Sequence, residues 1–194
     1  MGRKRMLRKV GVCLLLAVVL GGCEDVYTPK PKGYFRIAMP QKVYQQFDTD
    51  CPYSFEFPTY SLIHRDRSAN SNDCWYNIDF PLFRARLHLS YVPLENNLRN
   101  HVEAVRGLAY KHTIKADAIN EELTYDPDHQ KYGIFYDIKG NAASSVQFFI
   151  TDSTNHFMRG ALYFNHSPNK DSIAPVVSFI KEDINHLIES LRWK

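Results

Sequence analysis

The order of the predicted elements indicates an α+β domain in which one antiparallel β-sheet packs against two α-helices. Three strand-like segments follow one another between residues 132 and 164, with short connections between them. Consecutive strands joined by short turns pair in antiparallel fashion. Helical patterns occur at 98–109 and 177–191. Each carries an apolar stripe that must be buried, and the face of the sheet is the surface available for it.

The first two predicted strands share one sequence pattern. Residues 51–58 (CPYSFEFP) and 74–81 (CWYNIDFP) both read cysteine, any residue, tyrosine, any residue, apolar, acid, phenylalanine, proline. The alternation places the apolar side chains of each segment on one face. Each segment ends at a proline, which cannot donate to a β-ladder. We predict two strands joined at their starts by a disulfide, with the polar stretch 64–73 as a loop.

A third strand and the first helix follow. Residues 84–91 alternate between apolar and polar side chains, which is typical of a half-buried strand. Asn96 or Asn97 can cap a helix over 98–109, because a side-chain oxygen at that position accepts from a free backbone N–H. Its apolar residues recur at helical spacing. Residues 113–123 fit a strand or a helix equally well, and 125–129 read as a turn.

The remainder of the chain alternates strands and turns before a final helix. Strands are predicted at 132–138, 146–151 and 157–164, with turns at 140–141 and 152–155 and a loop at 165–170. The final helix has one apolar stripe, which ends at Leu191. Asp171 or Ser172 can cap this helix and Pro175 fits its first turn. We expect Trp193 to pack back on the domain.

The N-terminus has the three parts of a bacterial lipoprotein signal. A basic stretch (residues 3–9) precedes an apolar run (10–20), and Leu20-Gly-Gly-Cys23 follows as a lipobox. The apolar run is shorter than the roughly 20 residues needed to span a bilayer. We therefore predict a signal peptide at 1–22, lipidation at Cys23, a lipid-anchored tether at 23–33 and one globular domain at 34–194. The bacterial membrane is then a partner, reached through the Cys23 lipid, and whether it is the inner or the outer membrane stays open.

The predicted signal and lipid anchor indicate a domain in the cell envelope, facing the periplasm, and its charge and cysteine content fit that location. Five of the 24 basic residues lie in the signal peptide, so the mature chain has 19 basic and 21 acidic residues. This balance and the predicted export argue against nucleic acid as a partner. With Cys23 lipidated, Cys51 and Cys74 remain, and we predict a disulfide between them. The alternative, a redox or metal pair, lacks a C-x-x-C motif or a histidine at ligand spacing.

Candidate catalytic residues are few. A hydrolase triad could be formed by Ser144 or Ser145 together with His156 and Asp152. The serines lack the G-x-S-x-G elbow that exposes a nucleophile. Because these residue types are common in turns, we predict that the Asp152–His156 segment is a hydrogen-bonded turn and that the chain is not an enzyme.

Metal and cofactor sites have no sequence support either. No H-E-x-x-H or comparable motif is present, and neither is a nucleotide-binding motif, so we predict no metal and no cofactor. The polar stretch 111–117 fits a solvated strand or a binding edge. The histidines that could in principle ligate a metal are His88, His101, His112, His129, His156, His166 and His186.

Several segments, in order along the mature chain, carry a resemblance to a known family. They are 27–37 (YTPKPKGYFRI), 51–58, 74–81, 87–91 (LHLSY), 111–117 (KHTIKAD), 140–149 (GNAASSVQFF), 151–157 (TDSTNHF), 159–164 (RGALYF) and 191–194 (LRWK). Together they resemble the gliding-motility lipoprotein GldD family. By element order alone, the domain also resembles the Mog1/PsbP-like fold.

The family resemblance implies a cell-envelope lipoprotein needed for gliding motility and for the associated type IX protein secretion. Its partners would be protein components of that machinery, and it would act as a structural or assembly component with no catalytic residues. Only Cys23 carries over as a functional position. The alternatives are an envelope glycan- or lipid-binding module and, behind it, a Ser/His/Asp hydrolase.

Overall fold

The structure, a computed structural model, describes residue 2 and residues 37–68, 71–165 and 170–194. The predicted signal peptide (1–22), Cys23 and the tether (23–33) lie outside these residues. All elements below belong to one compact unit, Ile37–Lys194.

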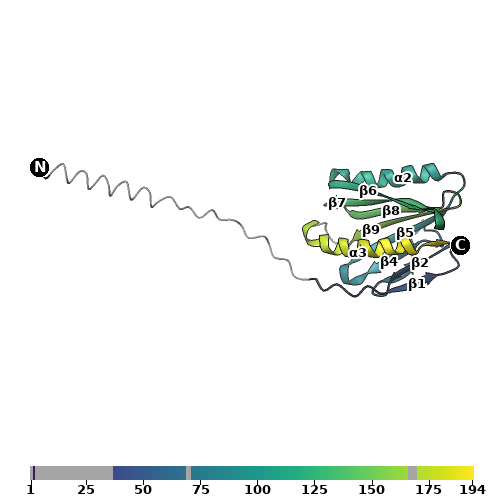
Figure 1. Cartoon of the computed structure of the whole chain (residues 1–194), viewed down its shortest axis with the longest axis horizontal. Coiled ribbons are helices and arrows are strands. Elements are labelled where there is room, and N and C mark those ends of the chain that lie inside the picture. Colours follow the sequence, from purple (N-terminus) through teal and green to yellow (C-terminus); the bar gives the residue numbers. More distant parts are fainter. Residues whose placement is uncertain (1, 3–36, 69–70, 166–169) are drawn as a thin grey trace. The chain divides into compact units, whose positions relative to one another are not determined.

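Ten strands form two antiparallel sheets (Figure 1). The small sheet has the order β1-β2-β10, with β1 at Tyr44–Asp48, β2 at Tyr53–Pro58 and β10 at Arg192–Trp193. The large sheet has the order β3-β4-β5-β9-β8-β7-β6. Its strands are β3 (Leu62–Arg65), β4 (Tyr76–Phe80), β5 (Ala85–Pro93), β6 (Ala116–Asp126), β7 (Lys131–Gly140), β8 (Ser144–Thr151) and β9 (His156–Phe164).

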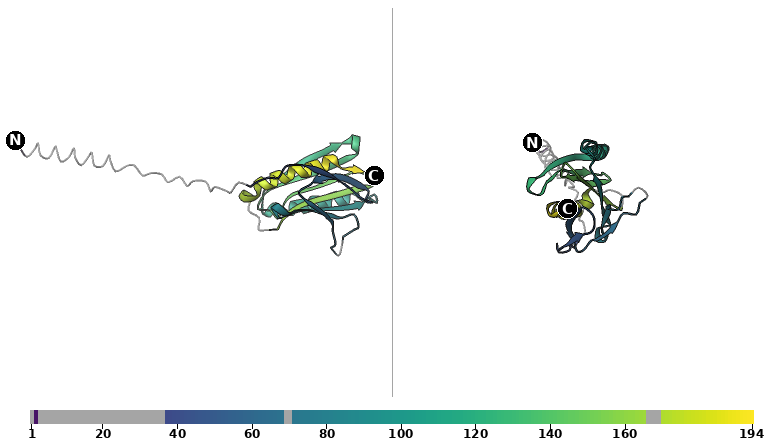
Figure 2. Two further views of the ribbon diagram at one scale, coloured as in Figure 1. Left: turned by 90° about the horizontal axis from the view of Figure 1, so that it is seen from below. Right: turned by 90° about the vertical axis from the view of Figure 1, so that its right-hand side faces the viewer.

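Two α-helices and three 3-10 turns complete the domain. The helices are α2 (Leu98–Tyr110) and α3 (Lys170–Ser190), and the turns are η1 (Pro81–Phe83), η2 (Lys111–Ile114) and η3 (Pro127–His129). The two helices lie on opposite faces of the large sheet (Figures 1 and 2). We call these the α2 face and the α3 face.

The main core lies on the α3 face, where the small sheet and α3 together cover the large sheet. Apolar residues of α3, among them Ile180 and Ile184, are buried with Phe55 of β2 and Phe148 of β8. The Phe148 ring packs directly on the backbone of Gly160 in β9, where a Cβ would lie 2.1 Å from the ring. A second, smaller core on the α2 face joins the helix to β7, β8 and β9.

The α+β class, with antiparallel strands and two helices, is confirmed. One feature of the prediction is wrong, since the strands divide between two sheets. The two segments with the shared pattern become β2 and β4, which lie in different sheets. β2 pairs instead with β1 and with the C-terminal β10. β10 lies at the far end of the chain from β2, and pairing between segments so far apart leaves no local signal.

Several boundaries also differ from the prediction. The ambiguous stretch 113–123 is the end of η2 followed by β6, and β6 extends into the predicted turn (125–129) as far as Asp126, with η3 forming the rest of that turn. His64 and Arg65, predicted in a loop, belong to β3. Asn97 occupies the N-cap position of α2, but its side chain accepts from the Glu95 N–H. The helix α3 starts at Lys170, so both predicted caps lie inside it.

The C-terminus packs back as expected. Trp193 pairs with Tyr53 in the small sheet, and its indole N–H donates to the Gln130 carbonyl at 3.1 Å. The indole ring also stacks on His156, with ring centroids 5.1 Å apart. The last strand therefore connects the small sheet to the turns at one end of the large sheet.

Candidate functional site

The residues of the predicted disulfide lie at the junction of the two sheets. Cys51 precedes β2, Cys74 precedes β4, and the structure joins them with Cα atoms 5.6 Å apart. The Tyr53 hydroxyl donates to the Cys74 carbonyl at 2.7 Å. The predicted lipidation site, Cys23, lies outside the described residues.

The structure does not assemble the candidate hydrolase triad. Ser144 is buried at the start of β8 and its hydroxyl donates to the Val146 carbonyl. His156 and Asp152 flank the turn at the other end of β8, roughly 23 Å away at the usual rise of a strand. Ser145 lies beside Ser144 and is equally remote.

The Asp152–His156 segment is the hydrogen-bonded turn that the sequence predicts. The Asp152 carboxylate accepts from the backbone N–H groups of Thr154, Asn155 and His156 at 2.8–2.9 Å. Partial burial acts to raise the pKa of this carboxyl, but the three N–H donors outweigh it and hold the pKa below its usual range. His156 in turn meets the Tyr91 hydroxyl at 2.8 Å. These contacts fix the turn and present no nucleophile.

The histidines that the structure describes do not gather into a metal site. Within residues 37–68, 71–165 and 170–194, no group of three or more His, Cys, Asp or Glu side chains could hold a metal ion. His166 lies outside these ranges. Over the same residues, no helix is long and apolar enough to cross a bilayer.

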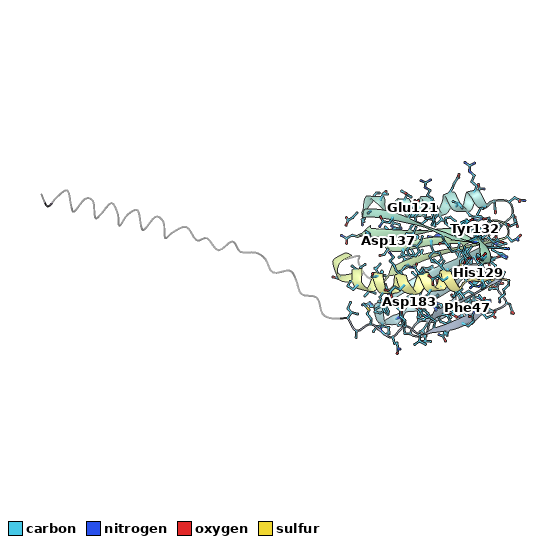
Figure 3. All side chains as sticks on the ribbon, in the orientation of Figure 1. Phe47, Glu121, His129, Tyr132, Asp137 and Asp183 are labelled. Atoms are coloured by element: carbon cyan, nitrogen blue, oxygen red, sulfur yellow. A yellow bond between two sulfur atoms is a disulfide. The ribbon has the colours of Figure 1, made fainter. Side chains whose placement is uncertain are left out.

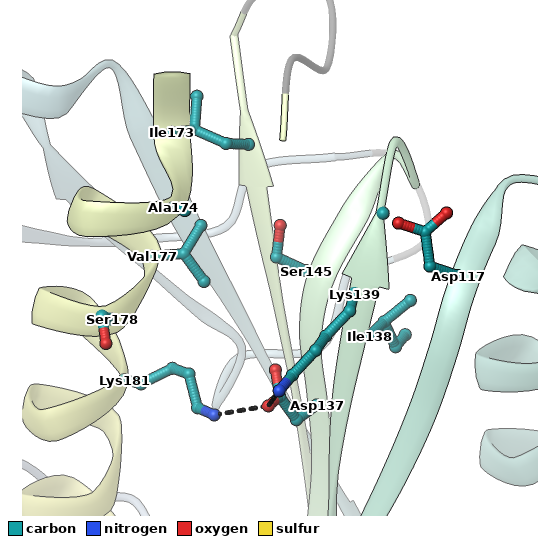
Figure 4. A pocket seen from close by; sticks show the side chains of 11 residues that line it. Asp117, Asp137, Ile138, Lys139, Ser145, Ile173, Ala174, Val177, Ser178 and Lys181 are labelled. Carbon is teal, nitrogen blue, oxygen red and sulfur yellow. Dashed lines mark ion pairs between the residues drawn. The ribbon is translucent and has the colours of Figure 1, made fainter. Parts of the chain in front are cut away.

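A cleft of about 460 Å³ opens on the α3 face, between α3 and the strands β7 and β8 (Figure 4). Its α3 wall is mostly apolar, with Ile173, Ala174 and Val177. Opposite, the buried Asp137 carboxylate meets the Lys181 ammonium at 2.8 Å, and Lys139 lies within 4.0 Å. Within the described residues no histidine lines the cleft, so no imidazole lies beside Ser145. The ion pair fastens α3 to β7.

The most exposed apolar side chains gather elsewhere, along β6. Of the large apolar residues in the described part of the chain, the three most exposed are Ile114 (91%), Leu123 (82%) and Tyr125 (77%). Ile114 ends η2, and the other two lie in β6. A group of exposed apolar side chains on one element marks an interaction surface more often than scattered ones do.

Register places Leu123 and Tyr125 on the α2 face. Leu123 lies opposite Ile134 of β7, and Tyr125 lies opposite Tyr132, with ring centroids 5.7 Å apart. Ile134 packs against the small core beneath α2. The exposed side chains of Leu123 and Tyr125 therefore lie on the same face of the sheet as that core, at its β6 margin. We call Leu123, Tyr125 and their acidic neighbours Glu121 and Glu122 the β6 surface.

The backbone of β6 adds to this surface. The strand has 11 residues and is the last in the order of the large sheet, so one of its edges has no strand partner among the described residues. Glu121 accepts from the Tyr110 hydroxyl of α2 at 2.8 Å and lies beside that helix in Figure 3, whereas Asp183 belongs to α3 and Asp137 pairs with Lys181 of that helix. An unpaired edge presents a row of N–H and C=O groups that another strand can pair with.

The stretch 111–117, which from the sequence fits a solvated strand or a binding edge, forms η2 and the start of β6. Residues 111–114 form η2, and the open edge is β6. Leu123 and Tyr125 were missed because the sequence left 113–123 open between a strand and a helix and placed Tyr125 in a turn. Ile119 and Leu123 are four positions apart, a spacing that also fits a helix.

Comparison with known proteins gives one family. A family model described as gliding motility lipoprotein GldD matches residues 24–193. No curated protein matches the chain. Among solved structures, cyanobacterial PsbP (CyanoP) from Synechocystis sp. PCC 6803 is similar, with a TM-score of 0.49 and 12% identity over 86% of this chain and 99% of that one.

Proposed function

This chain belongs to the gliding motility lipoprotein GldD family, and from that premise we propose that it docks a protein of the gliding and type IX secretion machinery through the β6 surface. It is a lipoprotein of the cell envelope. On this proposal it acts as a non-catalytic structural or assembly component. The observation that carries the proposal is the long open edge of β6 with two exposed apolar side chains beside it.

The chemistry of the edge defines the kind of partner. A partner strand added to β6 gains backbone hydrogen bonds from the edge, and its side chains alternate between the two faces. On the α2 face it would meet Leu123 and Tyr125, which favours apolar residues. Glu122 lies on the opposite face, and Glu121 lies beside Leu123. The partner segment should therefore be extended, partly apolar and basic.

The anchor sets where this docking takes place. We propose that residues 1–22 are removed, that Cys23 carries the lipid, and that residues 23–33 tether the domain at the membrane surface in the periplasm. Two or three acyl chains anchor stably, because each buried methylene contributes about 0.8 kcal/mol. The oxidising periplasm would also allow the Cys51–Cys74 bond to form.

The test is complementation of a clean deletion in the native host, with colony spreading and protein secretion scored together. Wild type should restore both. A chain with Leu123→Lys and Tyr125→Lys should restore neither, because the ammonium groups replace apolar contacts and repel a basic partner. Cys23→Ala measures the requirement for the lipid.

The matched control is Leu62→Lys, which changes an exposed leucine at the opposite edge of the same sheet. It should behave as wild type, and both lysine-substituted chains should reach wild-type amounts in the envelope fraction. If the doubly substituted chain restores spreading and secretion, docking through β6 is wrong. If the deletion strain itself spreads and secretes normally, the machinery role fails for this protein.

A further inference from the structure

The first residues of the domain are fastened to α3. The domain is described from Ile37 onwards, and five residues later the Lys42 ammonium donates to the Phe179 carbonyl at 2.8 Å and to the buried Asp183 carboxylate at 2.9 Å. The Phe179 ring in turn meets the ring of Phe83 in η1, with centroids 5.7 Å apart. The chain therefore enters the domain beside η1, at the end where α3 begins (Figures 1 and 2).

This end of the domain is the one nearest to the proposed lipid anchor. Cys23 precedes Ile37 by 14 residues, and a chain of that length spans at most about 50 Å. Because Lys42 holds the start of the domain against α3, the point at which the tether joins the domain is fixed. The surface around η1 is therefore the part of the domain that lies closest to the tether, and so to the membrane.

An open hollow of about 540 Å³ lies beside η1, over β4, β5 and β9. Pro81 of η1 lines it, and so does Arg84, the residue that ends this turn. Three further lining residues, Asp79, Arg86 and Tyr163, lie opposite one another on adjacent strands. Residues that are directly opposite share one face of a sheet, so these polar side chains border the same hollow.

Arg84 is the uncompensated cation of the hollow. Its side chain is exposed, and within the described residues it forms no ion pair or side-chain hydrogen bond. Arg86, in contrast, donates two hydrogen bonds to the Asp79 carboxylate. Burial, then the Arg86 charge, holds the pKa of His88 below its usual range, so this imidazole is neutral near pH 7. The hollow therefore has one free positive charge, which is complementary to an anion.

An exposed leucine adjoins this charge. Leu82 is 64% exposed and lies in η1 between two residues that line the hollow, Pro81 and Arg84. Its neighbour Phe83 is buried in the main core and fixes the turn. An apolar side chain next to an arginine matches the boundary of a bilayer, where acyl chains lie directly beneath phosphate groups. We call Leu82, Arg84 and the hollow the η1 surface.

We propose that the η1 surface contacts the membrane to which the chain is anchored and binds the phosphate of an anionic lipid. Arg84 pairs with the phosphate, and Leu82 enters the boundary with the acyl chains. Figure 3 shows His129 and Tyr132 at the opposite end of the domain. Tyr132 lies opposite Tyr125, so this orientation directs the Tyr125 end of β6 away from the bilayer. The proposal rests on the lipid anchor of the proposed function and not on docking through β6.

The experiment uses the lipidated mature chain in nanodiscs of phosphatidylglycerol or of phosphatidylcholine. Hydrogen exchange of the backbone amides of Leu82, Phe83 and Arg84 is compared between the two bilayers. We expect exchange to be about fivefold slower in the anionic bilayer, which corresponds to the roughly 1 kcal/mol that one arginine gains near an anionic membrane. Inorganic phosphate added to the phosphatidylcholine sample should leave the rates unchanged. Equal rates in the two bilayers, or equal protection by phosphate alone, would overturn the proposal.

A first pair of variants tests the charge. Arg84→Gln should abolish the protection by phosphatidylglycerol. Glutamine fits the left-handed backbone of this position (φ 51), since Gln130 has φ 52 at the corresponding position after η3. The matched control is Arg99→Gln, which removes an exposed arginine from α2 and should leave the protection complete.

A second pair tests the apolar contact and keeps the experiment decisive should Arg84→Gln fail to fold. Leu82→Glu should also abolish the protection, because an anionic bilayer repels the carboxylate, whereas Leu123→Glu on β6 should leave it complete. Full protection in a folded Arg84→Gln or Leu82→Glu chain would overturn the proposal. All four variants keep Cys23, so lost protection in an anchored chain reports the contact and not the anchor. These rates are measured without spreading or secretion, which distinguishes failure here from failure of docking through β6.

Discussion

The two margins of the large sheet differ in how they end. At one margin, β3 has four residues, and Arg65 at its end forms an ion pair with Asp73 at 3.3 Å. At the other margin, β6 has 11 residues, with Leu123 and Tyr125 exposed. Short, charged edge strands discourage pairing with other chains, and long edges with apolar side chains favour it. The comparison identifies β6 as the margin that is open to a partner.

The margins are also fastened by different chemistry. The β3 side is held to the small sheet by the Cys51–Cys74 bond, which lies just before β4. The β6 side is held to α3 by Lys131, a buried lysine at the start of β7. Its ammonium donates to the carbonyls of Ile188 and Glu189 at 3.0 and 2.7 Å and meets Asp126 at 3.2 Å. One margin depends on a covalent bond and the other on hydrogen bonds to a helix end.

The largest expected effect is at the β3 margin. Changing both Cys51 and Cys74 to serine should lower the free energy of unfolding by about 3 kcal/mol, because the unfolded chain regains the entropy of a closed loop. Urea unfolding measures the loss. Hydrogen exchange should accelerate most in β3 and β4. Adding reductant to the wild-type protein should reproduce the change, and equal stability with and without the bond would contradict the role given to it.

A smaller effect is expected at the β6 margin. Lys131→Met should lower the free energy of unfolding by about 2 kcal/mol, because the last carbonyls of α3 lose charged hydrogen bonds. Burial already lowers the pKa of this lysine, and the apolar replacement recovers part of the loss. The control is Lys139→Met, in the same strand but exposed, which should be near neutral. Lys131→Met with wild-type stability would show that α3 is held by its apolar face alone.

The smallest effect concerns the acid sensitivity of the β3 side. Asp79 accepts two hydrogen bonds from Arg86, and these hold the pKa of its carboxyl below the usual range. The folded pKa is therefore lower than the unfolded value of about 3.9. The stability that Asp79 contributes is complete above that value and is lost as the pH falls through the folded pKa.

Asp79→Asn should therefore cost less than about 1 kcal/mol near neutral pH, since the pair is partly exposed. Its stability should also fall less than that of wild type on acidification. Urea unfolding at neutral pH and again near pH 3 measures both. Asp73→Asn, in the exposed pair with Arg65, serves as the control. Parallel stability curves for the Asp79→Asn chain and wild type would contradict the assignment.

Local patterns in the sequence are sufficient to predict most of the elements. Alternation identifies β5, β7, β8 and β9, and the apolar stripe identifies α3, because each element must present one apolar face to a core. Three features are not predictable in this way. The edge strand β6 has an interrupted pattern because none of its side chains is fully buried, so neither face has to be apolar. The short strands β1 and β3 carry too few residues to show a period.

The family resemblance follows from segments in order along the chain, and it is the part of the function that the sequence determined by itself. Which strands share a sheet, which margin is open and which polar side chains share a face were decided by pairing between distant segments. Asn77 and Gln147 are 70 positions apart in the chain yet belong to one row of the sheet. Non-local contacts of this kind depend on the packing of the whole domain, and so only the tertiary structure reveals the β6 surface.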